Sequence, residues 1–415
     1  MQKATQQQTK EHNANLVLKT IFDHESISRA EIARITSLTR TTVSEIVAEL
    51  IAEGLVEEIG MGSSLGGKSP ILLSLVADSR YLIGLDLARN KFSGAIVNLR
   101  GEIRQMVEHE IKGFNGNAAL ASVYEILDQL VHTSNRPLVG IGIGTPGIVN
   151  ANDGVVVNAV NLDWKNLPLA RLIQERYHLP VSVINDSQAA AMGEYTFGKG
   201  HQPEGSLIVI NVRYGVGAGI IISGQLFHGD GGAAGEIGHV VVVREAGLPC
   251  RCGNHGCLET VASTQAVIQR AQMLIGHTNS SSLAGAPDNI TLDLLEQAFT
   301  AGDSLVRQVI LEAGRYLGMA ISNIVGTLNI HKVILAGDMT CFGKPWLDAI
   351  QDTMRQTTLA RLADETQIEF GQLGRNGIIL GASALILKNY SLLFTGNQHP
   401  LNLANGGASA WVPST

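Results

Sequence analysis

Apolar residues near the start of the chain recur at helical spacing, and polar residues mark where each helix begins. Val17, Leu18, Ile21 and Phe22 share one face of a helix. Ser28 is followed three residues later by Glu31, the signature of a capping box. A second helix is therefore predicted to begin directly after Ser28.

A third helix is predicted after Thr39, whose hydroxyl can cap it. Its apolar residues follow the spacing i, i+3, i+4, i+7, i+8 without a miss: Val43, Ile46, Val47, Leu50 and Ile51. Gly54 stands where this helix is expected to end, and apolar strands at 55–59 and 71–76 flank a glycine-rich stretch. Three helices followed by a hairpin predict a winged helix-turn-helix domain over residues 1–78.

The predicted DNA contacts lie at the start of the third helix, because this helix enters the major groove in winged helix-turn-helix domains. The polar residues expected to reach bases or phosphates there and on the wing are Arg40, Thr41, Thr42, Ser44, Gly67 and Lys68. Residues 1–80 carry eight lysines and arginines against ten acids, but no acid precedes Glu45 in the helix. The alternative is a small helical protein-interaction module.

The pattern changes at Tyr81. From there to about residue 390, apolar strands and amphipathic helices alternate, with glycines at many of the turns between them. Such alternation predicts an α/β architecture. Residues 391–415 lack periodicity and are expected to form a loose tail.

Composition narrows the class of protein further. The chain is 45% hydrophobic and 16% charged, which predicts sizeable folded cores. No apolar run reaches the length of a membrane span, and the polar N-terminus shows no secretion signal. We therefore expect a cytoplasmic protein with no membrane partner. The net charge of −7 requires any DNA contact to be local.

Three of the four cysteines fall within eight residues and predict a metal site. They are Cys250, Cys252 and Cys257, and His239 precedes the first by eleven residues. Three thiolates and one imidazole satisfy tetrahedral Zn²⁺ with no open position, as in a structural zinc site. The alternative is three buried reduced cysteines, since Cys250 and Cys252 are too close to bridge without strain. Cys341 stands apart and is expected to be an ordinary buried thiol.

The glycine-rich and cysteine-rich stretches carry a family resemblance. GVGAGIIISGQLFHGDGGAAGEIGH at 215–239 and CRCGNHGCLE at 250–259, with TPG and NDSQAAAMGE upstream, are similar to the ROK family of repressors, open reading frames and kinases. The resemblance extends from about Tyr81 to about Leu387. With a winged helix in front, the chain resembles the family's sugar-responsive repressors, of the xylose and N-acetylglucosamine kind.

The resemblance implies an actin-like, ribonuclease-H-like fold of two α/β lobes, here residues 79–194 and 195–390, with a sugar cleft between them. The positions that match the family's sugar contacts are Asn185, Asp186, Glu236, His239 and Glu259. Carboxylates and an amide suit a polyol, because each can accept from or bridge adjacent hydroxyls. Zinc on His239 would fix the orientation of its ring and leave the second nitrogen for a hydrogen bond.

Asp186 also matches the catalytic base of the family's kinases, but three parts of the nucleotide site depart from the kinase pattern. The first phosphate loop, D-x-G-[GA]-T-K, here reads DLARNK at 86–91. The second, G-T-G-x-G, reads RYGVG at 213–217, and the glycines on the adenosine side read AGD at 336–338. These bulky and acidic residues predict that the protein is not an enzyme.

The expected function is therefore that of a transcriptional repressor that binds operator DNA and senses a sugar or sugar phosphate. Two half-sites one helical turn apart would need two copies, and the resemblance implies a homodimer or homotetramer. One alternative is an active ATP-dependent sugar kinase with altered phosphate loops, possessing both activities or the kinase activity alone. Another is a sugar-gated protein-interaction module without DNA contact.

Overall fold

The computed structural model describes residues 6–63, 69–111, 116–200, 205–276, 281–284, 287–387 and 392–393. The wing residues Gly67 and Lys68, and nearly all of the predicted tail, lie outside the described residues. None of the helices that the structure describes combines the length and the apolar character needed to cross a bilayer.

The chain divides into two compact units. The first unit comprises the chain up to Ile184 together with the segment from Ala382 onward. The second unit comprises Asn185–Gly381. The division therefore differs from the predicted one, which placed the end of the first lobe at 194. The reason is α6 (Asp186–Thr196), which packs on the sheet of the second unit and belongs to it.

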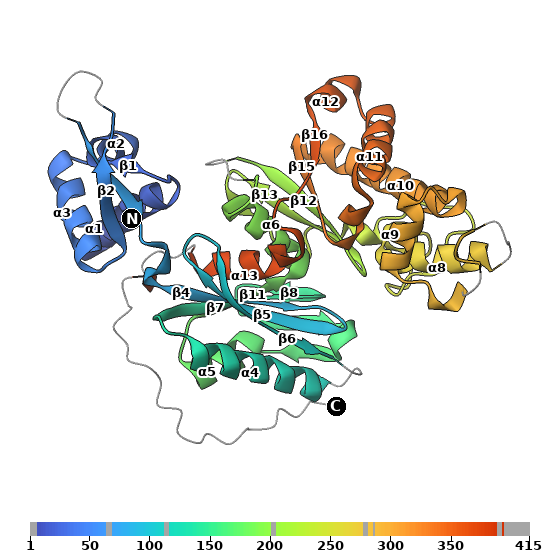
Figure 1. Cartoon of the computed structure of the whole chain (residues 1–415), viewed down its shortest axis with the longest axis horizontal. Helices are drawn as coiled ribbons and strands as arrows, with labels where there is room; N and C mark the ends of the chain where they lie inside the picture. The colour runs from blue at the N-terminus through green and yellow to red at the C-terminus, as the bar shows by residue number, and fades with distance from the viewer. Residues whose placement is uncertain are drawn as a thin grey trace. The chain divides into compact units, whose positions relative to one another are not determined.

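The N-terminal part is a winged helix-turn-helix (Figure 1). A three-stranded sheet of order β1-β3-β2 accompanies its three helices. The elements are α1 (Gln6–Phe22), β1 (Ile27–Ser28), α2 (Arg29–Thr36), α3 (Arg40–Ala52), β2 (Val56–Met61) and β3 (Ile71–Leu75). The apolar faces predicted for the first and third helices are buried, except that Ile51 is only half-buried.

The structure contains the predicted helix caps. The Ser28 hydroxyl accepts from the Glu31 backbone N–H, and the Glu31 carboxylate accepts in return from the Ser28 N–H at 3.0 Å. The Thr39 hydroxyl accepts from the Thr42 N–H at 3.1 Å. Gly54 follows α3 with φ +69°, a left-handed conformation that favours glycine.

The first unit also holds a five-stranded sheet of order β11-β7-β4-β5-β6. Its helices and strands are β4 (Tyr81–Leu87), β5 (Lys91–Asn98), β6 (Ile103–Glu110), α4 (Gly116–Thr133), β7 (Leu138–Thr145), α5 (Leu169–Tyr177) and β11 (Val181–Asn185). In Figure 1, α4 and α5 lie on one side of the sheet and α13 (Gly377–Leu387) on the other. A side chain at Gly142 of β7 would collide with the Ala382 carbonyl of α13, so glycine permits this close packing.

A small three-stranded sheet in this unit was not predicted. It consists of β8 (Ile148–Asn150), β9 (Val155–Ala159) and β10 (Trp164–Leu167). Trp164 is fully buried, and its indole N–H donates to the Gly116 carbonyl at 2.8 Å. The strands are short, so their alternation is hard to distinguish from the turns between them.

The second unit is built on a five-stranded sheet of order β14-β13-β12-β15-β16. Its strands are β12 (Leu207–Val212), β13 (Val216–Ile222), β14 (Gln225–Leu226), β15 (Lys332–Ala336) and β16 (Gln367–Phe370). The helices besides α6 are α7 (Glu259–Ala262), α8 (Thr264–Ile275), α9 (Leu292–Thr300), α10 (Ser304–Leu328), α11 (Gly343–Thr357) and α12 (Ala360–Glu365). Apolar residues of α8, α10 and α11 form one buried cluster with those of the sheet.

Both five-stranded sheets have the same topology. When the strands of each five-stranded sheet are numbered 1 to 5 in chain order, both sheets have the spatial order 3-2-1-4-5. Strand 2 is antiparallel to strands 1 and 3, and strand 4 is parallel to strand 1. This duplicated α/β pattern, which follows the winged domain in the sequence, confirms the predicted fold class.

Candidate metal and ligand site

The candidate site lies on the glycine-rich chain that connects β14 to α7 in the second unit. A 3₁₀ turn at Ile237–His239 is held against β13 by a hydrogen bond from the Ala218 N–H to the Gly235 carbonyl at 2.8 Å. Gly235 has φ +93°, and a side chain on it would collide with the Ala218 carbonyl oxygen. Glycine therefore allows Glu236 and His239 to be presented from the edge of the sheet.

The four predicted metal ligands come together. The donor atoms of His239, Cys250, Cys252 and Cys257 all lie within 4.8 Å of one another. The Cys252 and Cys257 sulfurs are 3.7 Å apart, and the Cys250 sulfur is 3.5 Å from His239 Nδ1. Tetrahedral Zn²⁺ with bonds of about 2.3 Å to sulfur and about 2.0 Å to nitrogen needs separations of about 3.5 to 3.8 Å. The donor set fits such an ion.

The local backbone fold explains how a cysteine-rich segment reaches this geometry. The Cys250 N–H donates to the Asn254 carbonyl at 2.7 Å and the Gly253 N–H to the Cys250 carbonyl at 3.0 Å, which closes a tight turn. Gly256 has φ +71°, and any side chain there would collide with the Val243 carbonyl. The turn and the glycine bring Cys257 back beside the other two sulfurs.

Burial makes two of the three thiols harder to ionise. Burial raises the pKa of the Cys257 thiol to about 12 and also raises the pKa of Cys250. The Asn254 backbone hydrogen bond lowers the pKa of Cys252. A bound divalent ion offsets the cost of buried thiolates, because it binds the deprotonated form of each thiol.

His239 connects the metal cluster to a group of carboxylates. Its Nδ1 faces the cluster, whereas Nε2 lies 3.8 Å from Glu236 Oε2. Burial raises the pKa of Glu236 to about 7, and the charges of Asp186 and Glu259 add to the effect. Three carboxylates and an imidazole, all predicted from the sequence, are thus close enough to influence one another.

Asn185 and Asp186 are positioned by the start of α6. The Asn185 side-chain oxygen accepts from the Ser187 and Gln188 N–H groups at 2.9 and 3.3 Å. Asp186 Oδ1 accepts from the Ser187 N–H at 2.7 Å. An acid at a helix N-terminus is stabilised by the exposed N–H groups and the helix dipole. Both side chains are half-buried.

Glu259, the first residue of α7, is held from two sides. Its Oε2 accepts from the Val216 N–H at 3.3 Å, and its Oε1 accepts from Arg251 Nη2 at 3.1 Å. Sequence reasoning did not select Arg251, which lies between two of the predicted metal ligands. Its place between the two cysteines does not indicate where its side chain points.

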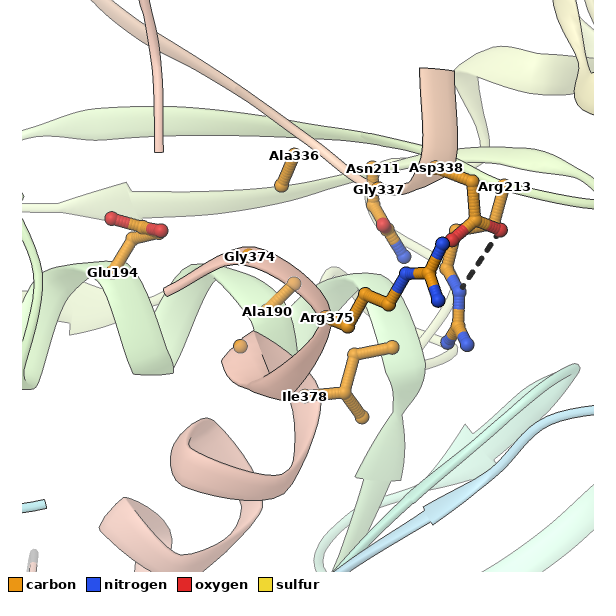
Figure 2. Close-up of a pocket in the computed structure, with 11 residues that line it drawn as sticks. Ala190, Glu194, Asn211, Arg213, Ala336, Gly337, Asp338, Gly374, Arg375 and Ile378 are labelled. Carbon is orange, nitrogen blue, oxygen red and sulfur yellow. Dashed lines mark ion pairs between the residues drawn. The ribbon is translucent and has the colours of Figure 1, made fainter. Parts of the chain in front are cut away.

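Four of the positions that depart from or belong to the kinase pattern, Arg213 and 336–338, line a separate pocket of the second unit. Arg213 Nε lies 3.9 Å from Asp338 Oδ2, and Figure 2 shows these two side chains and Arg375 pointing into the same space. The cavity that they leave has a volume of about 10 Å³, roughly the room that one water molecule needs.

The predicted DNA-contacting residues differ in how exposed their side chains are. Arg40, Thr41 and Ser44 are exposed at the start of α3. Thr42 is half-buried, and its hydroxyl lies 2.8 Å from that of Thr39 within the cap. Arg40 is therefore the exposed cation at the start of this helix.

Two of the acids further along the winged domain are paired with nearby cations. Glu49 lies 2.7 Å from Lys10, and Glu58 lies 2.8 Å from Arg29. These ion pairs reduce the repulsion that unpaired acids would exert on a phosphate backbone.

The family of the chain follows from comparison with known proteins. Residues 82–389 match the ROK family, and residues 13–57 match a winged helix-turn-helix DNA-binding domain. The chain belongs to the ROK family, and the predicted combination of the two parts is confirmed.

Relatives include both regulators and enzymes. A xylose repressor of Caldicellulosiruptor bescii is 34% identical over 92% of this chain and 96% of its own length. A glucokinase of Halalkalibacterium halodurans is 32% identical over 77% of this chain and 98% of its own. The crystal structure of a ROK family transcriptional regulator, a homologue of the Escherichia coli MLC protein, has a TM-score of 0.80 and 28% identity, covering 94% of this chain and 98% of that one. The match to regulators thus includes the DNA-binding part.

Proposed function

We propose that this protein is a transcriptional repressor whose binding to operator DNA is controlled by a sugar. The observation that carries the proposal is the combination of an intact polyol-binding constellation with an exposed helix-turn-helix in one chain. Asp186, Glu236, His239 and Glu259 supply acceptors and a donor for sugar hydroxyls. A zinc ion held by His239, Cys250, Cys252 and Cys257 would organise this site as a structural metal.

Control of DNA binding requires that the sugar distinguish two states of the protein. A ligand shifts an equilibrium only by its difference in affinity for the two conformations. We infer that the sugar favours the state that binds DNA poorly, and that two copies act together on paired half-sites. By linkage, operator DNA must then lower the affinity for the sugar by the same factor.

The same proposal holds that ATP-dependent phosphorylation has been lost. The Arg213–Asp338 pair occupies the pocket at two of the altered positions, and Tyr214 replaces a phosphate-loop threonine. The second candidate function is a sugar kinase, which is favoured by the glucokinase relative and by Asp186 at the position of the kinase base.

The test is fluorescence anisotropy of the full chain on DNA from its own upstream region, titrated with D-xylose, D-glucose and N-acetyl-D-glucosamine and with their phosphates. Specific binding that one of these compounds releases, with a steep dependence on salt, would support the repressor. Turnover of ATP on the same sugars without specific DNA binding would establish the kinase instead.

Asp186→Asn is expected to raise the sugar concentration needed for release of DNA by about tenfold or more, because a charged acceptor for a hydroxyl is lost. The amide oxygen can still accept from the Ser187 N–H, so α6 should keep its start. Operator affinity without sugar should not change. Asp348→Asn, at an exposed ion pair on α11, is the control. An unchanged response to sugar would remove Asp186 from the site.

A further inference from the structure

Arg251 links the predicted metal loop to a carboxylate of the candidate sugar site. It lies between Cys250 and Cys252, so metal binding restrains its backbone on both sides. Its guanidinium donates to Glu259 Oε1 at 3.1 Å and lies 5.2 Å from the centre of the Tyr214 ring. An arginine at this distance from an aromatic face is attracted by the ring, which limits the directions that its side chain can take.

The opposite oxygen of Glu259 is fixed by the turn between β12 and β13. The Val216 N–H donates to Oε2, and a Cβ on Gly215 would come within 2.5 Å of the same oxygen. The missing side chain thus lets the turn approach the carboxylate. Among the described residues, one donor is seen for each oxygen, and an ionised carboxylate can accept about four hydrogen bonds, so capacity remains for hydroxyls.

Tyr214 gives this arrangement a feature that the kinase pattern lacks. It stands where that pattern has the threonine of the second phosphate loop, and it places an aromatic ring beside Arg251. The turn that would approach a phosphate in a kinase therefore supports the arginine that holds Glu259. The replacement of threonine by tyrosine agrees both with the loss of phosphate binding at this turn and with a role of the turn in supporting Arg251.

We infer that Arg251 is a positioning residue that sets the selectivity of the sugar site by fixing the orientation of Glu259. This inference rests on the proposed function, in which Glu259 accepts from sugar hydroxyls. Epimers differ in the direction of one hydroxyl, and an acceptor discriminates between them only when its own direction is fixed. A carboxylate released from Arg251 can rotate to follow either epimer.

The test compares Arg251→Ala, Arg251→Lys and the unaltered full-length protein by calorimetric titration. The probes are D-xylose with its epimers D-lyxose and L-arabinose, and D-glucose with D-mannose, D-galactose and glucose 6-phosphate. Arg251→Ala should weaken binding of the preferred sugar by about tenfold. The ratio of affinities between that sugar and its epimers should fall toward one. Arg251→Lys should restore part of the affinity, because the charge returns without the planar fork.

Arg244→Ala is the matched control, since Arg244 is exposed in the same segment and takes no part in the contacts of Glu259. Zinc content is measured for every variant. Retained zinc with lost selectivity supports the inference. Unchanged selectivity in Arg251→Ala overturns it, as does loss of zinc, which would make the role structural, or an effect confined to glucose 6-phosphate, which would make Arg251 a phosphate contact. If the unaltered protein binds none of these probes and none of the sugars and sugar phosphates used to test the proposed function, the proposed function fails and the inference fails with it.

Discussion

Replacing Cys252 with serine is expected to release the metal and to weaken sugar binding by about tenfold or more. A serine hydroxyl is a poor zinc ligand, and loss of even an outer partner of a ligand costs 10- to 100-fold in metal affinity. If zinc is bound as proposed, its loss removes the contact that orients the His239 ring and one of the restraints on the segment that carries Arg251. Cys252 is exposed, so the substitution removes a ligand without opening the core.

The measurement is zinc content by atomic absorption together with calorimetric titration of the sugar that releases DNA. Cys341→Ser is the control, because this thiol is half-buried and lies outside the group of possible metal ligands. It should keep its zinc and its sugar affinity. Sugar binding that persists in Cys252→Ser after the metal has left would show that zinc does not organise the site.

The features that could be predicted from the sequence depend on residues close together in the chain. The capping box at Ser28, the Thr39 cap and the turn at Gly54 each act within a few positions, and the structure confirms all three. The metal cluster was predictable for a similar reason, since its three cysteines are near neighbours. The proximity of Asp186 to Glu236 could not be predicted from neighbouring residues in the chain, and only the family resemblance implied it.

The features that were missed depend on directions of side chains or on partners far along the chain. Thr42 was predicted to reach DNA, and its hydroxyl also lies 2.8 Å from that of Thr39, a contact that was not predicted. The pairing of Arg213 with Asp338 joins the ends of two strands that are neighbours only in the folded sheet. The assignment of α6 to the first lobe followed chain order, whereas the helix packs on β12 and β13. No local pattern specifies the last two contacts, because each depends on the completed sheet.

Arg40→Ala is expected to weaken specific DNA binding by about 10- to 100-fold, the effect of losing one arginine that reads a base. Arg40 is exposed at the first position of α3, where side chains of a recognition helix reach base edges. Thr39, and not Arg40, caps the helix, so the fold of the domain should be unaffected. Anisotropy on the operator and on a scrambled fragment measures the specific and the non-specific affinity separately.

Arg40→Lys distinguishes the two ways in which this residue can bind DNA. Lysine keeps the charge but cannot make the paired hydrogen bonds that arginine makes to guanine. If Arg40 reads a base, Arg40→Lys should lose specificity but keep the salt dependence of the unaltered protein. If it contacts only phosphate, lysine should restore most of the affinity, and Arg40→Ala should weaken binding to both fragments alike. Sugar affinity should be unchanged in both variants, and a loss of sugar binding in either would contradict a DNA-binding domain that is separate from the sugar site.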